Sequence, residues 1–206
     1  VDVLTTGNHV WDKPEIIPYI KKQPRLLRPL NMPEATPGNG LVTHINEAGK
    51  RLTVVNVMTN LFMAANDPVF AALDGALVRY KLGRDADFIL VDAHGEATSE
   101  KMALGHMVDG RASVLVGTHT HVPTADQRIL PGGTAYQTDV GMCGDYDSVI
   151  GMNKETAINR FTGRCNSRLS VALGAVTICG LVVEADDAGM AQTVQSLRCG
   201  SELVPA

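Results

Sequence analysis

The sequence has little positive charge and no long apolar run. Its 18 lysines and arginines are outnumbered by 22 aspartates and glutamates, so the formal net charge is −4. Proteins that bind duplex DNA or an anionic membrane through charge need a basic field, so neither is expected as a partner. No apolar stretch approaches the roughly 20 residues of a membrane span, and no signal peptide is visible. We therefore expect a cytoplasmic protein.

Cysteines are also few, and none has CxxC spacing. The four are Cys143, Cys165, Cys179 and Cys199. A structural zinc ribbon is therefore unsupported, and a chain of 206 residues is long enough to build a core without disulfides. We expect reduced thiols, as in the cytoplasm. The chain also lacks an initiator Met and opens at Val1 as if inside a strand, so we expect its natural N-terminus to lie upstream.

The hydrophobic pattern predicts one α/β domain over residues 1–206. Prolines between residues 23 and 40 indicate an irregular loop there. The first predicted helix begins with Asp12 as its N-cap, and Cys179-Gly180 is expected to separate the last two strands. We expect strands at 1–6, 41–46, 51–58, 87–91, 113–116, 127–130, 134–138, 169–178 and 181–184, and further helices from 67, at 98–108 and at 153–161. In the 98–108 helix, Ala103, Met107 and Val108 are expected to face inward.

Four of the six histidines follow predicted strands. His119 and His121 lie on a turn that begins at Gly117, His9 follows Gly7-Asn8, and His94 comes shortly after another apolar run. In layered α/β folds the carboxyl ends of strands meet at one edge, where ligand sites collect. We therefore expect these side chains to converge, whereas His44 and His106 are expected to be ordinary structural histidines.

This set of side chains favours a hydrolytic metal site. Neutral imidazoles bind zinc, iron or manganese, and the amide oxygen of Asn8 suits a site with open positions. Two metals about 4 Å apart can hold a hydroxide and clamp a phosphate. His9 follows a ligand-type residue and can instead protonate a leaving alkoxide.

A two-metal centre normally needs a bridging carboxylate, and the sequence offers no good candidate at a strand end. Asp92 precedes His94 by two residues, and we expect it to cap a helix or to support a metal ligand rather than to bind metal itself. Asp139 and Asp145 lie in a glycine-rich loop. Turn formation is the favoured interpretation of both, and support of the site or contact with substrate is the other.

Beyond these arguments, several longer sequence segments resemble those of the YmdB-like branch of the calcineurin-like metallophosphoesterases. They are TTGNHVWDK (5–13), RLLRP (25–29), HGEATSEK (94–101), VGTHTHVPTAD (116–126) and TDVGMCGDYDSVIG (138–151). The likeness runs from Val1 to about residue 184. It implies a two-sheet αββα sandwich and cleavage of cyclic nucleotide phosphodiesters such as 2′,3′-cyclic AMP at a di-iron centre, although spacing alone does not separate iron from manganese or zinc.

The resemblance also implies roles for particular residues. Asn8, His94 and His119 would bind one metal, His121 would bind the other, and His9 would be the general acid. The family opens with a strand ending in Gly-Asp and another ending in an Asn-Gly-Glu-Asn type motif, and neither is present here. We therefore expect an N-terminally truncated member that lacks these strands and the bridging carboxylate, binds the second metal weakly and keeps little activity.

Two other functions stay open. A signalling or scaffold protein that binds a nucleotide or a partner would explain the missing carboxylates, but it would not need a proton donor such as His9. A metal-dependent amidohydrolase would expect an early His-x-His pair, which is not found. The nucleobase and the oligomeric state, a homo-oligomer included, are not determined by the sequence.

Overall fold

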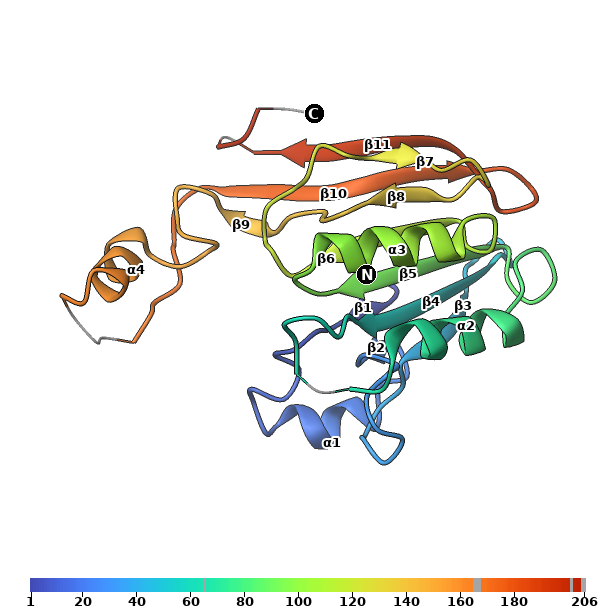
Figure 1. The fold of residues 1–206 in the computed structure, drawn as a ribbon, viewed down its shortest axis with the longest axis horizontal. Helices are drawn as coiled ribbons and strands as arrows, with labels where there is room; N and C mark the ends of the chain where they lie inside the picture. Colours follow the sequence, from blue (N-terminus) through green and yellow to red (C-terminus); the bar gives the residue numbers. More distant parts are fainter. Residues whose placement is uncertain (65, 165–167, 201, 205–206) are drawn as a thin grey trace.

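A six-stranded mixed sheet forms the centre of the fold. The computed structural model describes residues 1–64, 66–164, 168–200 and 202–204 (Figure 1). The strand order is β3-β4-β5-β6-β8-β7; the inner strands are parallel, and β3 and β7 run antiparallel at the two edges. The strands are β3 Leu41–Ile45, β4 Arg51–Met58, β5 Phe88–His94, β6 Val114–Thr118, β7 Arg128–Ile129 and β8 Ala135–Gln137.

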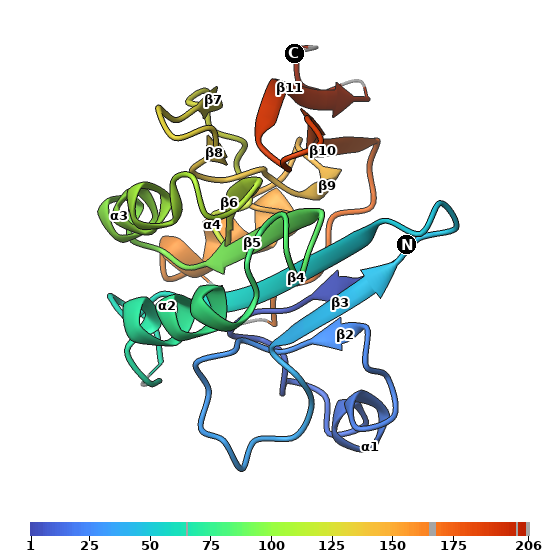
Figure 2. The same ribbon diagram turned by 90° about the vertical axis from the view of Figure 1, so that its right-hand side faces the viewer.

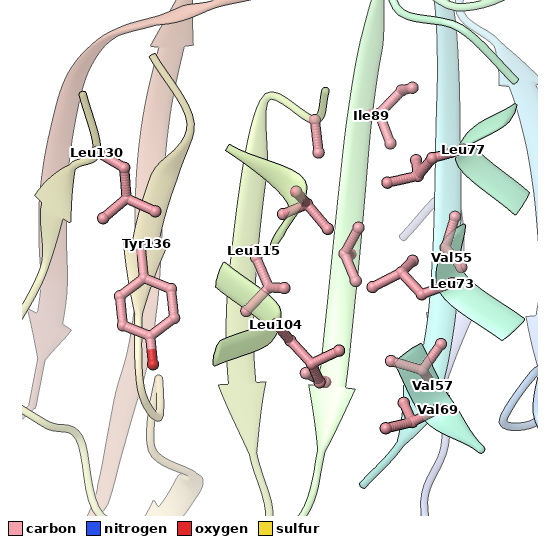
Figure 3. Packing of buried hydrophobic residues seen from close by; sticks show 14 of the residues in the cluster. Val55, Val57, Val69, Leu73, Leu77, Ile89, Leu104, Leu115, Leu130 and Tyr136 are labelled. Carbon is pink, nitrogen blue, oxygen red and sulfur yellow. The ribbon is translucent and has the colours of Figure 1, made fainter. Parts of the chain in front are cut away.

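Two helices cover one face of this sheet and bury the main core. They are α2 (Val69–Arg79) and α3 (Thr98–Val108). Leu73 and Leu77 of α2 and Leu104 of α3 pack on Val55, Ile89 and other sheet side chains (Figure 3). Because both faces of the inner strands are buried, the sequences of these strands are continuous apolar runs.

The opposite face carries a second layer of strands in two pieces (Figure 2). One piece is the three-stranded sheet of β9 (Cys143–Asp145), β10 (Val176–Ala185) and β11 (Ala191–Cys199). The other is the parallel pair β1 (Leu4–Thr5) and β2 (Leu26–Leu27), against which α1 (Ile16–Ile20) packs. The layers therefore follow the expected αββα order where α1 covers the β1–β2 pair, while α4 (Lys154–Phe161) projects away from them (Figure 1).

The last two strands differ from the prediction. Strand β10 runs without interruption through Cys179-Gly180, and the turn comes later, at residues 186–190, where Asp186 accepts hydrogen bonds from the backbone of Ala188 and Met190. A glycine inside a strand gives the same local signal as a glycine in a turn. Strand β11 was missed because it is half exposed and therefore rich in polar residues, and no strand forms over 169–175.

Two predictions about the helices were also wrong. Helix α1 begins only at Ile16, and Asp12 does not cap it, because its carboxylate instead pairs with Nδ1 of His9. Ala103 faces solvent, and Lys101 and Leu104 of α3 point inward instead. The 23–40 loop and the 41–58 hairpin agree with expectation, apart from the short β2 within the loop.

Among the residues that the structure describes, no helix is long and apolar enough to cross a membrane. Cys143, Cys179 and Cys199 are free thiols, as expected, whereas Cys165 lies outside the described residues. The assignment of residues 1–206 to one domain stays a prediction.

Candidate metal centre

Three of the predicted site residues converge at the carboxyl end of the central strands. The Oδ1 atom of Asn8, which follows β1, lies 2.7 Å from Nε2 of His94 at the end of β5. Nδ1 of His119, directly after β6, lies 3.3 Å from the same Nε2 atom. The segments meet because β5 and β6 are parallel neighbours, with His94 opposite Thr118 in the register.

The surrounding hydrogen bonds indicate which nitrogens carry protons. Thr118 Oγ1 donates to Asp92 Oδ1 and must therefore accept from Nδ1–H of His94, which leaves a lone pair on Nε2. In the same way, Glu96 Oε2 lies 3.2 Å from Nε2 of His119 and draws the proton to that side, so that Nδ1 keeps its lone pair. Three lone-pair atoms, counting Asn8 Oδ1, face one another.

The electrostatics keep these imidazoles neutral. Burial, and next the nearby His119, lower the pKa of His94 to about 4. Burial also lowers the pKa of His119, although the carboxylate of Glu96 opposes this. Neutral imidazole is the form that binds metal. Lone pairs that converge without a proton to share are satisfied by a cation, so the residues fit a metal ion.

Close backbone packing gives the cluster its shape. A Cβ at Gly7 would overlap the ring of His94 at Nε2, and a Cβ at Gly117 would overlap the carbonyl oxygen of Thr138. Beyond Gly117 the chain turns sharply, with positive φ at His119 (110°) and His121 (68°). Such conformations are strained for residues other than glycine and persist only when the surroundings hold them.

A buried ion pair beneath this turn stabilises its strained conformation. Lys101 of α3 is fully buried, and its Nζ donates to the carbonyl oxygen of Thr118 and to Oδ2 of Asp139. The same carboxylate accepts from the backbone N–H of Thr120, and Oδ1 accepts from that of Gly141. Asp139 therefore forms a turn and also supports the loop that carries His119 and His121.

The other two predicted site residues lie at the margin of the cluster. His9 is exposed, and its Nδ1 lies 2.9 Å from Asp12 Oδ2. His121 bonds through Nδ1 to the carbonyl oxygen of Ile150. Both lie near enough that a positive charge on them would lower the pKa of a cluster histidine. His9 acts in this way on His94, and His121 acts on His119.

Carboxylates stand around the cluster rather than within it. Asp92 accepts from Thr118, as expected of a supporting residue, and burial raises its pKa to about 6. Asp145 makes turn contacts with the backbone of Asp147 and Gly174. Over the described parts of the chain, no three His, Cys, Asp or Glu side chains gather as a metal-binding group; the convergent set is two imidazoles and an amide.

Sequence reasoning missed three contributors to the site, namely Glu96, Lys101 and Thr118. Glu96 and Lys101 lie in the HGEATSEK segment, but charged residues near the start of a helix are usually interpreted as capping or solvated groups. Nothing in the spacing shows that Lys101 is buried or that Glu96 reaches His119. These contacts depend on how α3 lies on β6.

Comparison with known proteins finds close relatives of the chain. A 2′,3′-cyclic-nucleotide 2′-phosphodiesterase of Bacillus subtilis (strain 168) is 49% identical over 186 residues, which are 90% of this chain and 69% of that protein. A crystal structure described as a hypothetical protein from Thermus thermophilus superposes with a TM-score of 0.89 at 42% identity and covers 97% of this chain and 77% of that one.

The crystal structure of a phosphatase from Mycoplasma pneumoniae superposes with a TM-score of 0.85 at 32% identity, covering 97% of this chain and 72% of that one. The fold is therefore the mixed α/β fold of the metallophosphoesterase type, as predicted. A family model described as YmdB-like protein matches residues 1–197. The chain thus belongs to the YmdB-like protein family.

Proposed function

We propose that this chain is a metal-dependent phosphodiesterase that opens 2′,3′-cyclic nucleotides. Membership of the family, with a relative named as a 2′,3′-cyclic-nucleotide 2′-phosphodiesterase, supports phosphoric diester hydrolysis. The observation that carries metal dependence is the convergence of Asn8, His94 and His119 through unprotonated atoms. Asn8, His94 and His119 would hold one metal, and His121 would contribute to a second.

In this proposal the chain's own residues orient the substrate and handle its proton. A metal, when bound, supplies charge stabilisation and a nucleophile from water at neutral pH. Water adds to phosphorus, the bond from phosphorus to the 2′ oxygen breaks, and that oxygen takes a proton from His9. Asp12 holds Nδ1 of His9 and leaves Nε2 for the transfer. The product is a nucleoside 3′-monophosphate.

Three finer expectations belong to this proposal. We expect two metal ions, with iron favoured by the family resemblance, although two imidazoles and an amide also suit manganese or zinc. The free thiols Cys143, Cys179 and Cys199 are consistent with the reducing cytoplasm. A homo-oligomer also stays a prediction.

The test is hydrolysis of 2′,3′-cyclic AMP, followed by phosphorus NMR, with bound metal measured on the same sample. The experiment uses this chain and, if its gene encodes a longer one, the whole product. For His9→Gln we expect turnover to fall about 100-fold or more while metal content is kept, because a general acid contributes about 10²–10⁴ in rate. His44→Gln, away from the cluster, is the matched control.

The outcomes separate enzyme from scaffold. His119→Ala should lose metal as well as turnover. Absence of both metal binding and turnover in every form would overturn the proposal. Nucleotide binding that survives His9→Gln, with no turnover in either protein, would favour the scaffold interpretation.

A further inference from the structure

We infer that the apolar cavity beside His121 is the subsite for the nucleobase of the substrate. The cavity has a volume of about 330 Å³, and its mostly apolar lining consists of His121, Val122, Met142, Tyr146, Ser148, Val149 and Ile150. This inference rests on the proposed function, since it assumes that a nucleotide phosphate lies at the cluster of Asn8, His94 and His119.

The position of the cavity suits a base attached to that phosphate. His121 forms part of its wall and follows His119 by two residues on the same turn. A larger cavity of about 570 Å³ is also lined by Val149 and Ile150 and lies against α4, but none of the site histidines lines it. Of these two cavities, the smaller is therefore the one that a candidate site histidine lines.

The chemistry of the wall suits a flat, largely apolar ring. Val122 and Ile150 are 54% and 53% exposed, so two large apolar side chains are left open to solvent beside a polar site. A phosphate or a sugar hydroxyl gains little from such a wall, whereas a heterocyclic base covers apolar surface and makes favourable contacts with methionine sulfur and an aromatic ring. Small-molecule sites are typically apolar pockets of about 300–1,000 Å³.

Hydrogen bonds hold this wall in shape without a ligand. The hydroxyl of Tyr146 accepts from the backbone N–H of Met142 and lies 3.3 Å from the carbonyl oxygen of His121, so its polar end is already engaged. Ile150 has a φ of 49°, and its carbonyl oxygen accepts from His121. Backbone hydrogen bonds between Val149 and Met152 close the turn. A preformed pocket lowers the ordering cost of binding.

The experiment compares two probes that differ by the nucleoside. Adenosine 3′-monophosphate and inorganic phosphate are titrated separately into the metal-loaded protein while the methyl groups of Met, Val and Ile are observed by NMR. We expect ring-current shifts at Met142, Val122 and Ile150 with the nucleotide and not with phosphate. The methyl groups of Val78, an exposed valine on α2, serve as the control.

A variant tests the same point by affinity. Ile150→Asn combined with Val122→Ser removes the two exposed apolar side chains of the wall, and asparagine tolerates positive φ at position 150. We expect the ratio of nucleotide affinity to phosphate affinity to fall about fivefold or more, and to stay as in the parent protein for Val78→Ser.

The two proposals fail differently in this experiment. If phosphate and nucleotide both fail to bind, the proposed function is wrong. If both bind with equal affinity and the methyl groups of the cavity do not shift with the nucleotide, the phosphate site stands and the nucleobase subsite is wrong.

Discussion

At the scale of single residues, strain and close packing gather around one loop region. Of the four non-glycine residues with positive φ in the described chain, three lie there, namely His119, His121 and Ile150, and a hydrogen bond joins the latter two. Each such residue costs on the order of 1–3 kcal/mol, which the surrounding contacts must offset. The histidine turn is therefore held by its neighbours rather than by local preference.

Gly7 is the residue whose replacement should disturb the cluster most directly. A Cβ there would overlap the ring of His94 at Nε2, so Gly7→Ala must displace the ring. We expect at least tenfold weaker Mn²⁺ binding, measured by electron paramagnetic resonance titration. Gly75→Ala in α2 is the control, because its Cβ meets nothing within 4 Å and alanine favours a helix by about 1 kcal/mol. Unchanged Mn²⁺ affinity in Gly7→Ala would contradict the assigned site.

Lys101 should be the costliest polar residue to remove. Its partner Asp139 is only 1% exposed, and Lys101→Met would leave that carboxylate buried without a counter-charge. Breaking such a pair from one side costs about 3–5 kcal/mol of unfolding free energy. Urea denaturation measures this loss, and Lys154→Met, which breaks an exposed pair with Asp147, should change stability much less. Equal effects of the two substitutions would show that the buried pair does not hold the turn.

At the scale of elements, parallel strands carry the site residues to one edge. Strands β5 and β6 end at His94 and Thr118, and their register sets these residues side by side. At the opposite end of the sheet, Asp87 just before β5 accepts from the backbone and guanidinium of Arg51 at the start of β4. The two ends of the sheet are thus organised by different chemistry.

The Arg51–Asp87 contact predicts a specific pH dependence of stability. Hydrogen bonds from Arg51 lower the pKa of Asp87 from 3.8 to about 2. Because the folded-state pKa is depressed, the carboxylate stabilises the fold above pH 3.8, and this contribution is lost as pH falls toward 2. Asp87→Asn should therefore lower the unfolding free energy at pH 7, and its difference from the parent should shrink between about pH 4 and pH 3.

Urea unfolding at about pH 7, 4 and 3 measures that difference. Asp187→Asn, in the exposed turn before β11, controls for the loss of a carboxylate. A difference between Asp87→Asn and the parent that stays constant over these pH values would contradict the role of Arg51.

At the scale of the whole molecule, the two faces of the large sheet are unequally packed. Among the described residues, the core under α2 and α3 holds fifteen buried apolar residues, whereas the cluster between the two sheets holds three, namely Val114, Ala135 and Ala191. On the outer face of β10 and β11, Val176, Ile178, Val182 and Leu197 are exposed. The three-stranded sheet therefore contributes less apolar burial to stability.

This asymmetry predicts how the protein opens locally. Backbone amides of β4 and β5 should exchange with deuterium only through global unfolding, and those of β10 and β11 should exchange through a smaller, less costly opening. Native-state hydrogen exchange in low urea measures both opening free energies. Equal values for the two pairs of strands would show that the sheets unfold as one unit.

The sequence pattern was enough to predict a mixed α/β domain and its main helices, and the family resemblance implied the αββα sandwich. The histidines that follow strands were expected to converge: His94 and His119 do so with Asn8, whereas His9 and His121 lie at the margin. Periodicity and strand ends are local signals, and the carboxyl ends of parallel strands share one edge. Local signals failed at Gly180 and Ala103, because a glycine in a strand resembles a turn and a short helix has more than one plausible inward face.

Only the tertiary structure decided what surrounds the cluster. The contact of Glu96 with His119, the burial of Lys101 against Asp139 and the cavity beside His121 join residues that lie far apart in the chain. Such contacts depend on how helices and loops pack on the sheet, and spacing along the chain carries no record of that packing. The physical reason is that protonation, burial and cavity shape arise from neighbours in space, whereas periodicity reports only neighbours in sequence.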